Sequence, residues 1–479
     1  MVDLSITEEV LADGKVRYRL GEPNWAGRRI PDIHRPGSTI QIRTDRMIDV
    51  IILGDGFTDR ATFRAELEDW LAAFYGFPIY ETFAGCFRIR ALYTPSNQAA
   101  SAARGSYYRC WISSTGRALE AGDNVDWPNS PAAEDVAFRD AIWRSVDLFT
   151  DANLRRYPAS LDIGDSDQAL TNAGIRDRYR NLVVSLLVRS ALPDTDPPGF
   201  DLHVSGRVID IPRSAPNQAI HMAVAVGALE LHEFGHAFAQ LADEYIKTDY
   251  RGRGYEGDDA REPPSPTSVF SLSNLWFSNL TPEVPWIHLS PGGWQRRTAS
   301  GQDPSPLVGW MWVGGMRQHG VWHAEYMCLM NGGHHNFAFT QVAADDPTID
   351  DGVVKGADLR GRAPSFCLWC QEIVAIRILE KTDQLLEAGD SSDITTQGTL
   401  WWDRWVERLR ANYRTLLNVD QQILDAESRY AAMFPGKNGE PLWRSDLYAV
   451  PTAPTPPAAS PGPSLTGEEL LLLTAAALP

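Results

Sequence analysis

The run LHEFGHAFAQLADEY at residues 231–245 constrains the fold of this chain more than any other stretch. It places His232 and His236 four residues apart, with Glu233 between them. On a helix, residues i and i+4 lie one above the other, so both imidazoles can bind one tetrahedral zinc ion. Glu233 can then take a proton from a water molecule that the metal activates. The pattern predicts an active-site helix of a zinc hydrolase, most often a peptidase.

The residues before this motif favour a buried helix over a solvated one that carries the pattern by chance. Residues 219–231 are apolar almost all round, which predicts that the helix already runs through this stretch inside a core. Ser214 and Asn217 offer N-cap oxygens, and Pro216 suits a first turn. Two histidines and a glutamate at the far end of such a helix would be costly to bury unless they were paired or bound to a metal.

A third zinc ligand has to come from beyond this helix. On an unbroken helix, Asp243 would lie roughly 10 Å along the axis from His236, which is too far for one ion. We therefore expect the chain to leave the helix soon after His236, although no glycine marks the turn. We predict Asp243 as the third ligand and keep Glu244 as the alternative. A further hypothesis is that both carboxylates lie outside the ligand set and support the histidines or the next loop.

Other segments share a pattern with a known family. They are IDVIILGDGFT at residues 48–58, VPWIH at 284–288, YMCLM at 326–330 and FCLWCQE at 366–372. Together with HEFGHAFAQLADEY, they resemble in content and order the IgA peptidase family of bacterial zinc metallopeptidases, which have the zincin fold. The resemblance implies an endopeptidase with Met330 in a turn beneath the zinc, as in metzincins. It does not extend to IgA as the substrate, because residues 321–326 depart from the family's Tyr-Arg-Pro approach.

The predicted reaction is hydrolysis of a peptide bond in a protein or peptide substrate, with one zinc ion as the cofactor. Glu233 acts as the general base and then passes its proton to the leaving amine. The candidates for an additional oxyanion donor are Tyr245, His323 and Tyr326. Two other classes stay open, namely a zincin-fold binding or assembly module without turnover and a zinc hydrolase of a non-peptide amide. The presence of Glu233 disfavours the first, and the shape of the cleft would decide the second.

The cysteines do not form a disulfide framework, since the chain has only five in 479 residues: Cys86, Cys110, Cys328, Cys367 and Cys370. The last three could form a second zinc site or a redox pair, with His334 or His335 as a fourth ligand. Alternatively, a disulfide joins the Met330 turn to the following helix, or all of them are buried free thiols.

Charge and hydropathy exclude some partners. With 44 basic and 62 acidic side chains, the net charge of −18 disfavours a groove that binds nucleic acid. The sequence contains no run of about 20 apolar residues that could span a membrane, and its start has no secretory signal pattern. We expect a chain that is cytoplasmic as synthesised, or that is exported by a dedicated route other than the general secretory one.

The predicted fold class is α/β, of the α+β zincin-like kind, with a mixed sheet, the buried helix that carries HExxH, and a helical C-terminal part. Strands are predicted at 16–20, 38–43, 50–53, 87–92, 181–188 and 206–211, a helix at 60–75, and helices from 366 to 434. The predicted divisions are a β-rich segment (1–45), a catalytic domain (46–385), a helical extension (386–450), a Pro-rich linker (451–465) and a short apolar helix (466–479). The apolar helix either folds back on the domain or docks on a partner, and the Pro-rich linker favours docking on a partner.

Overall fold

The computed structural model describes residues 4–21, 28–97, 107–108, 141–142, 144–149, 182–188, 207–210, 219–224, 228–239, 241–242, 244, 274–277, 285–289, 312–313, 321–325, 328–331, 366–387, 390 and 400–433. The chain divides into two compact units, Met1–Glu440 and Pro441–Pro479, and all described residues belong to the first. The predicted linker and C-terminal helix, 451–465 and 466–479, lie outside the described residues.

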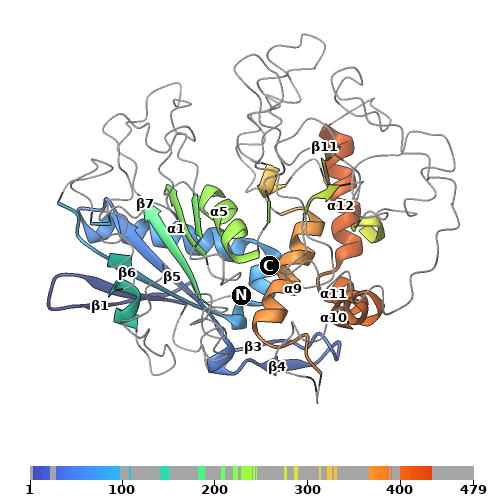
Figure 1. The fold of residues 1–479 in the computed structure, drawn as a ribbon, viewed down its shortest axis with the longest axis horizontal. Coiled ribbons are helices and arrows are strands. Elements are labelled where there is room, and N and C mark those ends of the chain that lie inside the picture. Colours follow the sequence, from blue (N-terminus) through green and yellow to red (C-terminus); the bar gives the residue numbers. More distant parts are fainter. Residues whose placement is uncertain are drawn as a thin grey trace, which may run out of the picture. The chain divides into compact units, whose positions relative to one another are not determined.

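Seven strands of the described residues form the main sheet, in the order β1-β2-β6-β5-β7-β9-β8 (Figure 1). In chain order they are β1 (Ile6–Val10), β2 (Val16–Leu20), β5 (Ile48–Asp55), β6 (Phe87–Tyr93), β7 (Leu182–Val188), β8 (Arg207–Asp210) and β9 (Ala219–Val224). The four inner strands β6, β5, β7 and β9 are parallel. β1, β2 and β8 pair antiparallel at the two sides. The class is therefore mixed α/β, as predicted.

Strand β5 shows why this sheet forms. All eight of its residues are buried, and it has a parallel neighbour on each side. A strand covered on both faces requires a continuous apolar run rather than an alternating one, and Val50–Leu53 supply it. Of its two buried carboxylates, Asp49 accepts hydrogen bonds of 2.6 Å from both Arg88 and Arg90 on β6, so this carboxylate is paired where it is buried.

The turn after β5 depends on two glycines. A Cβ atom on Gly54 would lie 2.5 Å from the Phe63 ring, and Gly56 has a φ of 79°, which favours glycine. Between them, Asp55 accepts a hydrogen bond of 2.7 Å from the backbone amide of Tyr108. Helix α1 (Arg60–Gly76) then begins with Asp59 as its N-cap, whose carboxylate accepts from the amide of Thr62.

The other elements of the described residues are helices, short strands and 3-10 turns. The α-helices are α2 (Pro78–Thr82), α5 (Ala228–Ala239), α9 (Leu368–Lys381), α10 (Leu400–Arg404), α11 (Arg410–Leu416) and α12 (Val419–Met433), with a π-helical turn at Trp405–Leu409. Short strands form two smaller sheets, β3 (Arg29–Pro31) with β4 (Thr39–Gln41), and β10 (Trp276–Phe277), β12 (Val321–His323) and β11 (Trp312–Val313). Single 3-10 turns lie at Thr44–Arg46, Ala84–Cys86, Asp147–Phe149, Ile287–Leu289 and Leu329–Asn331.

Most of the secondary structure predicted from hydrophobic patterns is confirmed, including the helix at 60–75 and the strand at 181–188, but one prediction is wrong. The apolar run 219–231 is not a single helix. Residues Ala219–Val224 form β9, an interior strand between β7 and β8, and α5 begins only at Ala228. A short run that is apolar all round fits a buried strand as well as a buried helix, so periodicity could not decide. The proposed N-cap residues, 214–217, therefore precede a strand and lie outside the described residues.

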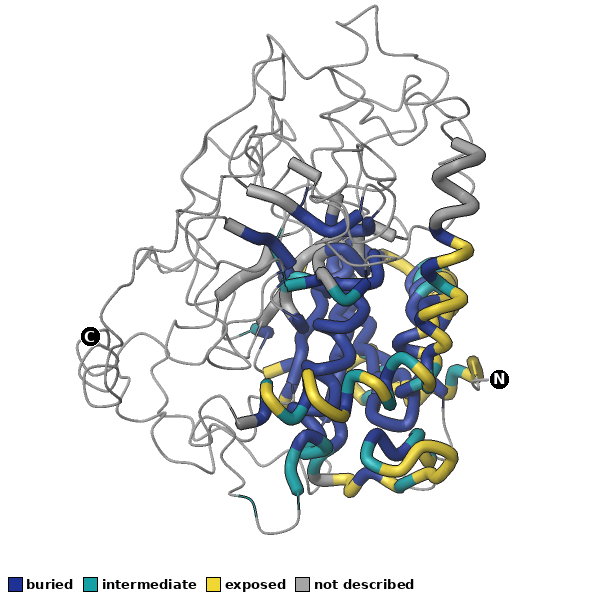
Figure 2. Tube along the Cα trace, turned by 90° about the vertical axis from the view of Figure 1, so that its right-hand side faces the viewer, coloured by how far each residue is buried: buried dark blue, intermediate teal, exposed yellow. Residues whose placement is uncertain are grey.

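Helix α5 packs between the sheet and α9. It contacts β9, β7 and β8 on one side and α1, α9 and the Leu329–Asn331 turn on others. The Phe234 ring lies edge-to-face with Trp70 and Phe74 of α1, and it stacks on Phe238 at 5.3 Å. In Figure 2 the buried residues form one continuous dark blue body with exposed residues at its margin. Aromatic burial on this scale fixes the orientation of α5.

Helix α9 is buried along all of its residues. Its Glu372 carboxylate accepts hydrogen bonds from His288 Nε2 (2.6 Å), Trp405 Nε1 (2.8 Å) and Arg410 Nε (2.8 Å). Burial by itself raises the pKa of Glu372, but His288 and Arg410 outweigh it and lower the pKa to about 2. Trp405, which donates to Glu372, is itself fully buried. Within the described ranges, no helix combines the length and apolarity needed to cross a bilayer.

Candidate functional site

The end of α5 carries the two histidines of the motif. The helix ends at Ala239, three residues after His236, which confirms that the chain leaves the helix early. The turn is closed by the amide of Leu241, which donates to the carbonyl of Gly235 at 3.3 Å. No glycine is needed, because hydrogen bonds across the helix end accommodate the change of direction.

The two imidazole rings converge through their Nε2 atoms. The Nε2 atoms of His232 and His236 lie 3.0 Å apart. On the other side of each ring, Nδ1 meets a backbone carbonyl: His232 faces Leu329 O at 2.8 Å, and His236 faces Leu241 O at 2.5 Å. His232 is buried, and His236 is half-buried. Both rings are thus held by backbone atoms outside the helix, with the opposite nitrogens directed at one point.

This geometry has an electrostatic consequence. Carbonyl oxygens can only accept, so each Nδ1 carries a proton and donates it. A neutral ring in this tautomer has a lone pair on Nε2, and the two lone pairs of His232 and His236 face each other. They repel unless a cation or a proton lies between them. Two nitrogen ligands of a tetrahedral zinc ion are about 3.3 Å apart when the Zn–N bonds are about 2.0–2.1 Å, so the observed pair fits a metal.

The Leu329–Asn331 turn packs against the same helix. A Cβ atom added to Gly235 would lie 3.0 Å from Met330 Sδ and 3.1 Å from the Phe366 ring, so Met330 lies close against α5 next to His236. Two backbone carbonyl groups of this turn also accept hydrogen bonds. Leu329 O receives the hydrogen bond of His232, and Met330 O accepts from the amide of Glu244 at 2.8 Å. This turn therefore positions both the helix and the segment that follows it.

The structure describes only some of the residues predicted as the base and the third ligand. The backbone of Glu233 lies in α5 between His232 and Phe234. Asp243, the predicted third ligand, lies outside the described residues. Glu244, the alternative, is fully buried, and its carboxylate faces a group of cysteines: Glu244 Oε1 accepts from Cys370 Sγ at 3.1 Å.

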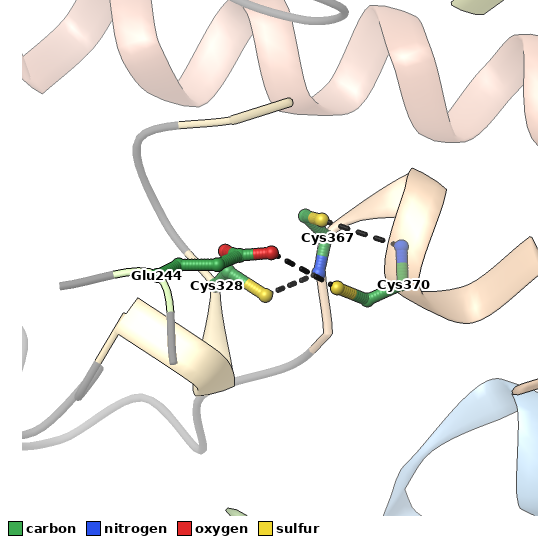
Figure 3. Close-up of side chains that lie close together, drawn as sticks. All are labelled: Glu244, Cys328, Cys367 and Cys370. Atoms are coloured by element: carbon green, nitrogen blue, oxygen red, sulfur yellow. Dashed lines mark hydrogen bonds between the residues drawn. The ribbon is translucent and has the colours of Figure 1, made fainter. Parts of the chain in front are cut away.

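Glu244 and the three cysteines form a compact buried cluster, which we call the cysteine cluster (Figure 3). The ligand atoms of Glu244, Cys328, Cys367 and Cys370 all lie within 4.8 Å of one another, a grouping that could hold a metal ion. Two amides donate to sulfur: Cys367 N to Cys328 Sγ at 3.3 Å, and Cys370 N to Cys367 Sγ at 3.4 Å. The cysteines of the cluster are free thiols in the structure. The fourth group suggested from sequence, His334 or His335, lies outside the described residues.

The charges in the cysteine cluster are coupled. Burial raises the pKa of Glu244 to about 7, with a further contribution from Cys328. Burial also raises the pKa values of the Cys367 and Cys370 thiols. For Cys328, burial acts in the same direction, but hydrogen bonds from the other two thiols and from backbone amides outweigh it and hold its pKa well below the usual range. Cys328 is therefore the thiol of the cluster whose thiolate form is most favoured.

Two further residues, Asn274 and His323, lie against Glu244, and Asn274 is not identified from the sequence. Asn274 donates to Glu244 Oε1 at 2.9 Å and pairs with the backbone of Ala242 through its side-chain amide. His323, a sequence candidate for an oxyanion donor, is buried with Nδ1 3.4 Å from Glu244 Oε2. The signal that could have found Asn274 is weak, because a lone asparagine before a short strand is usually a turn residue.

Comparison with known proteins does not extend this description. Neither the models of protein families nor the curated proteins compared with this chain give a match. The function is therefore argued from the residues and their geometry.

Proposed function

We propose that this chain is a zinc-dependent peptidase, with a zincin-like arrangement in which α5 is the active-site helix. The observation that carries the proposal is the convergence of His232 Nε2 and His236 Nε2 at 3.0 Å, with both Nδ1 atoms donating to carbonyl groups. Such hydrogen bonds fix the tautomer that leaves Nε2 available to a metal. The end of α5 three residues later allows the following carboxylates to turn away from the helix axis.

The roles follow from the chemistry of the side chains. His232 and His236 would hold the ion, and Asp243 would complete a three-residue set that leaves one position open. When bound, zinc would polarise a peptide carbonyl and make water more acidic. Glu233, between the two histidines in the sequence, would accept the proton of the attacking water and pass it to the leaving amine. Placing the base next to the ligands on one helix keeps the reacting groups together.

Met330 supports the proposal as a packing residue. Its side chain lies against Gly235, the residue between Phe234 and His236, and its turn supplies the carbonyl that holds His232. This is the position that the resemblance to the IgA peptidase family implies for Met330. An endopeptidase of that kind would act on a protein or peptide substrate whose identity depends on the loops around the cleft.

The test compares wild-type full-length chain with Glu233→Gln, measuring zinc content and cleavage of casein and of a mixed peptide library. We expect the variant to keep its zinc and to lose activity by about 10²–10⁴ or more, because the general base is removed while the ligands stay. Removal of zinc with a chelator should abolish wild-type cleavage, and added zinc should restore it. Comparable cleavage by the variant, or by the metal-free protein, would contradict the proposal.

A further inference from the structure

The cysteine cluster has the composition of a structural zinc site. Cys367 and Cys370 are separated by two residues, a spacing common among zinc ligands, and Cys328 approaches from the Met330 turn. Soft thiolates favour zinc over magnesium or calcium. In a tetrahedral site with Zn–S bonds of about 2.3 Å, the sulfur atoms are about 3.8 Å apart. Ligand atoms that already lie within 4.8 Å of one another need only a small inward movement.

The backbone around the sulfur atoms is arranged for thiolates. Cys367 is the N-cap of α9, and its sulfur accepts from the amide of Cys370. The amide of Cys367 in turn donates to Cys328 Sγ. Donors of this kind and the positive end of a long helix both stabilise negative sulfur. A metal ion between the thiolates would neutralise charge that the helix end alone offsets only in part.

Glu244 is an independent indication of a ligand. Its side chain is fully buried, and within the described part of the chain its Oε2 atom has no hydrogen bond, since the nearby His323 Nδ1 lies at 3.4 Å without hydrogen-bond geometry. An ionised carboxylate in that position is costly unless a cation compensates it, and His323, which lies within ion-pair distance, does so only when its ring is protonated. Its other oxygen faces Cys370 Sγ, so the carboxylate is directed into the cysteine cluster.

We infer that Glu244, Cys328, Cys367 and Cys370 bind a second zinc ion, separate from the ion proposed at His232 and His236. Four protein ligands leave no open position, so this ion is structural. It would join three segments: the chain after α5, the Met330 turn and the start of α9. The segments it would fix also carry Leu329 O, the acceptor that holds His232. The inference does not depend on peptidase activity.

The experiment counts zinc per chain by elemental analysis in full-length protein purified under reducing conditions. The double variant His232→Ala/His236→Ala removes the first proposed site and should retain one zinc per chain. Adding Cys370→Ser should remove that zinc, whereas adding Cys86→Ser should not. Cys86 is the matched control because it is also a buried free thiol but is not part of the cysteine cluster. A zinc-free double variant, or full retention after Cys370→Ser, would overturn the inference.

A second measurement does not require these variants to fold. Wild-type protein loaded with cobalt(II) in place of zinc should show the near-ultraviolet charge-transfer band of thiolate-bound cobalt. Alkylation under denaturing conditions should label all three cysteines of the cluster. Absence of the band, or a mass that reveals a disulfide between two of them, would overturn the second site. Since neither readout involves cleavage, a failure here is distinguishable from a failure of the peptidase proposal.

Discussion

The two candidate metal centres differ in how the chain brings their ligands together. His232 and His236 lie on one helix, four residues apart, and their convergence follows from helix geometry. The cysteine cluster collects its members from three segments: Glu244 and Cys370 are 126 positions apart in the sequence, and Cys328 and Cys367 are 39 positions apart. The first pair is recognisable as soon as the helix is predicted. The second exists only when α5, the Met330 turn and α9 have packed.

The two centres also differ in burial, which suits a catalytic role for the histidine pair and a structural role for the cysteine cluster. The histidine pair is only partly buried, since His236 is half-buried, and a reacting site requires such access. Every member of the cysteine cluster is buried, which suits an ion that stabilises the fold rather than one that binds substrate. Mutating residues of one centre at a time therefore tests whether the two centres are separate.

The largest expected effect is on zinc content and cleavage, for which substitutions of Asp243 and Glu244 should give opposite results. Asp243→Ala should remove the zinc held by the histidine pair, and cleavage with it, while the cysteine cluster keeps its ion. Glu244→Ala should do the reverse, because its carboxylate faces Cys370 rather than the histidines. Zinc counting together with the cobalt–thiolate band identifies which ion is lost. If Glu244→Ala removes the histidine-bound ion instead, the third ligand is Glu244.

The next prediction concerns the anchoring of α9, the helix that carries two of the clustered cysteines. Glu372→Gln should lower the free energy of unfolding by about 3–5 kcal/mol, because it leaves partners of a buried charge uncompensated. The control is Glu68→Gln, which breaks the exposed Arg64–Glu68 pair of α1 and should cost about 0.3–0.5 kcal/mol. Chemical denaturation measures both. Equal losses would show that α9 does not depend on this carboxylate.

A smaller effect is expected at the helix that carries the histidines. Alanine in place of a helical glycine usually stabilises by up to about 1 kcal/mol. At Gly235 the new Cβ would press on Met330 and Phe366, whereas at Gly76 it would meet nothing within 4 Å. Gly235→Ala should therefore be less stable than Gly76→Ala by about 1–3 kcal/mol. Thermal unfolding of the two variants tests this, and equal stability would argue against close packing of Met330 on α5.

The smallest effect on zinc content and cleavage is expected for the tail, residues 451–479, which contains none of the proposed zinc ligands. Truncation after Val450 removes the Pro-rich linker and the predicted apolar helix, and should leave zinc content and cleavage unchanged. Association with itself or with a partner should be lost, which analytical ultracentrifugation can measure for self-association. An insoluble or inactive truncated protein would show that residues 470–478 stabilise the catalytic part.

Local patterns predicted much of the fold. The β5 run and the helix after it follow from residue type and spacing, because each depends on neighbours in the sequence. The early end of α5 follows instead from the requirement that a carboxylate after His236 reach the same ion. The strand at Ala219–Val224 was not, because its assignment depends on pairing with β7 and β8. A run that is apolar on all sides indicates that the segment is buried, but it does not indicate whether the backbone is helical or extended.

The same limit applies to the candidate site. The sequence predicts the histidine pair with its residues, whereas for the three cysteines it suggests His334 or His335 as a fourth ligand and not Glu244. The sequence suggests Glu244 as the alternative ligand of the histidine pair or as a support for the histidines or the next loop, because it follows them in the chain. Its burial beside Cys370 results from the turn after Ala239 and from the position of α9. Residues that are distant in the sequence can be assigned to one metal site only when the packing of their segments is known.

The central claim is that this chain holds two zinc ions at separate places, one on the histidine pair and one in the cysteine cluster. Diffraction data from crystals of the full chain, collected on both sides of the zinc absorption edge, test it most directly. The account predicts two anomalous peaks, one within bonding distance of His232 Nε2 and His236 Nε2, and one among the sulfur atoms of Cys328, Cys367 and Cys370. A zinc-replete crystal without a peak at the histidine pair would contradict the proposed function, and one without a peak at the sulfur atoms would contradict the second site.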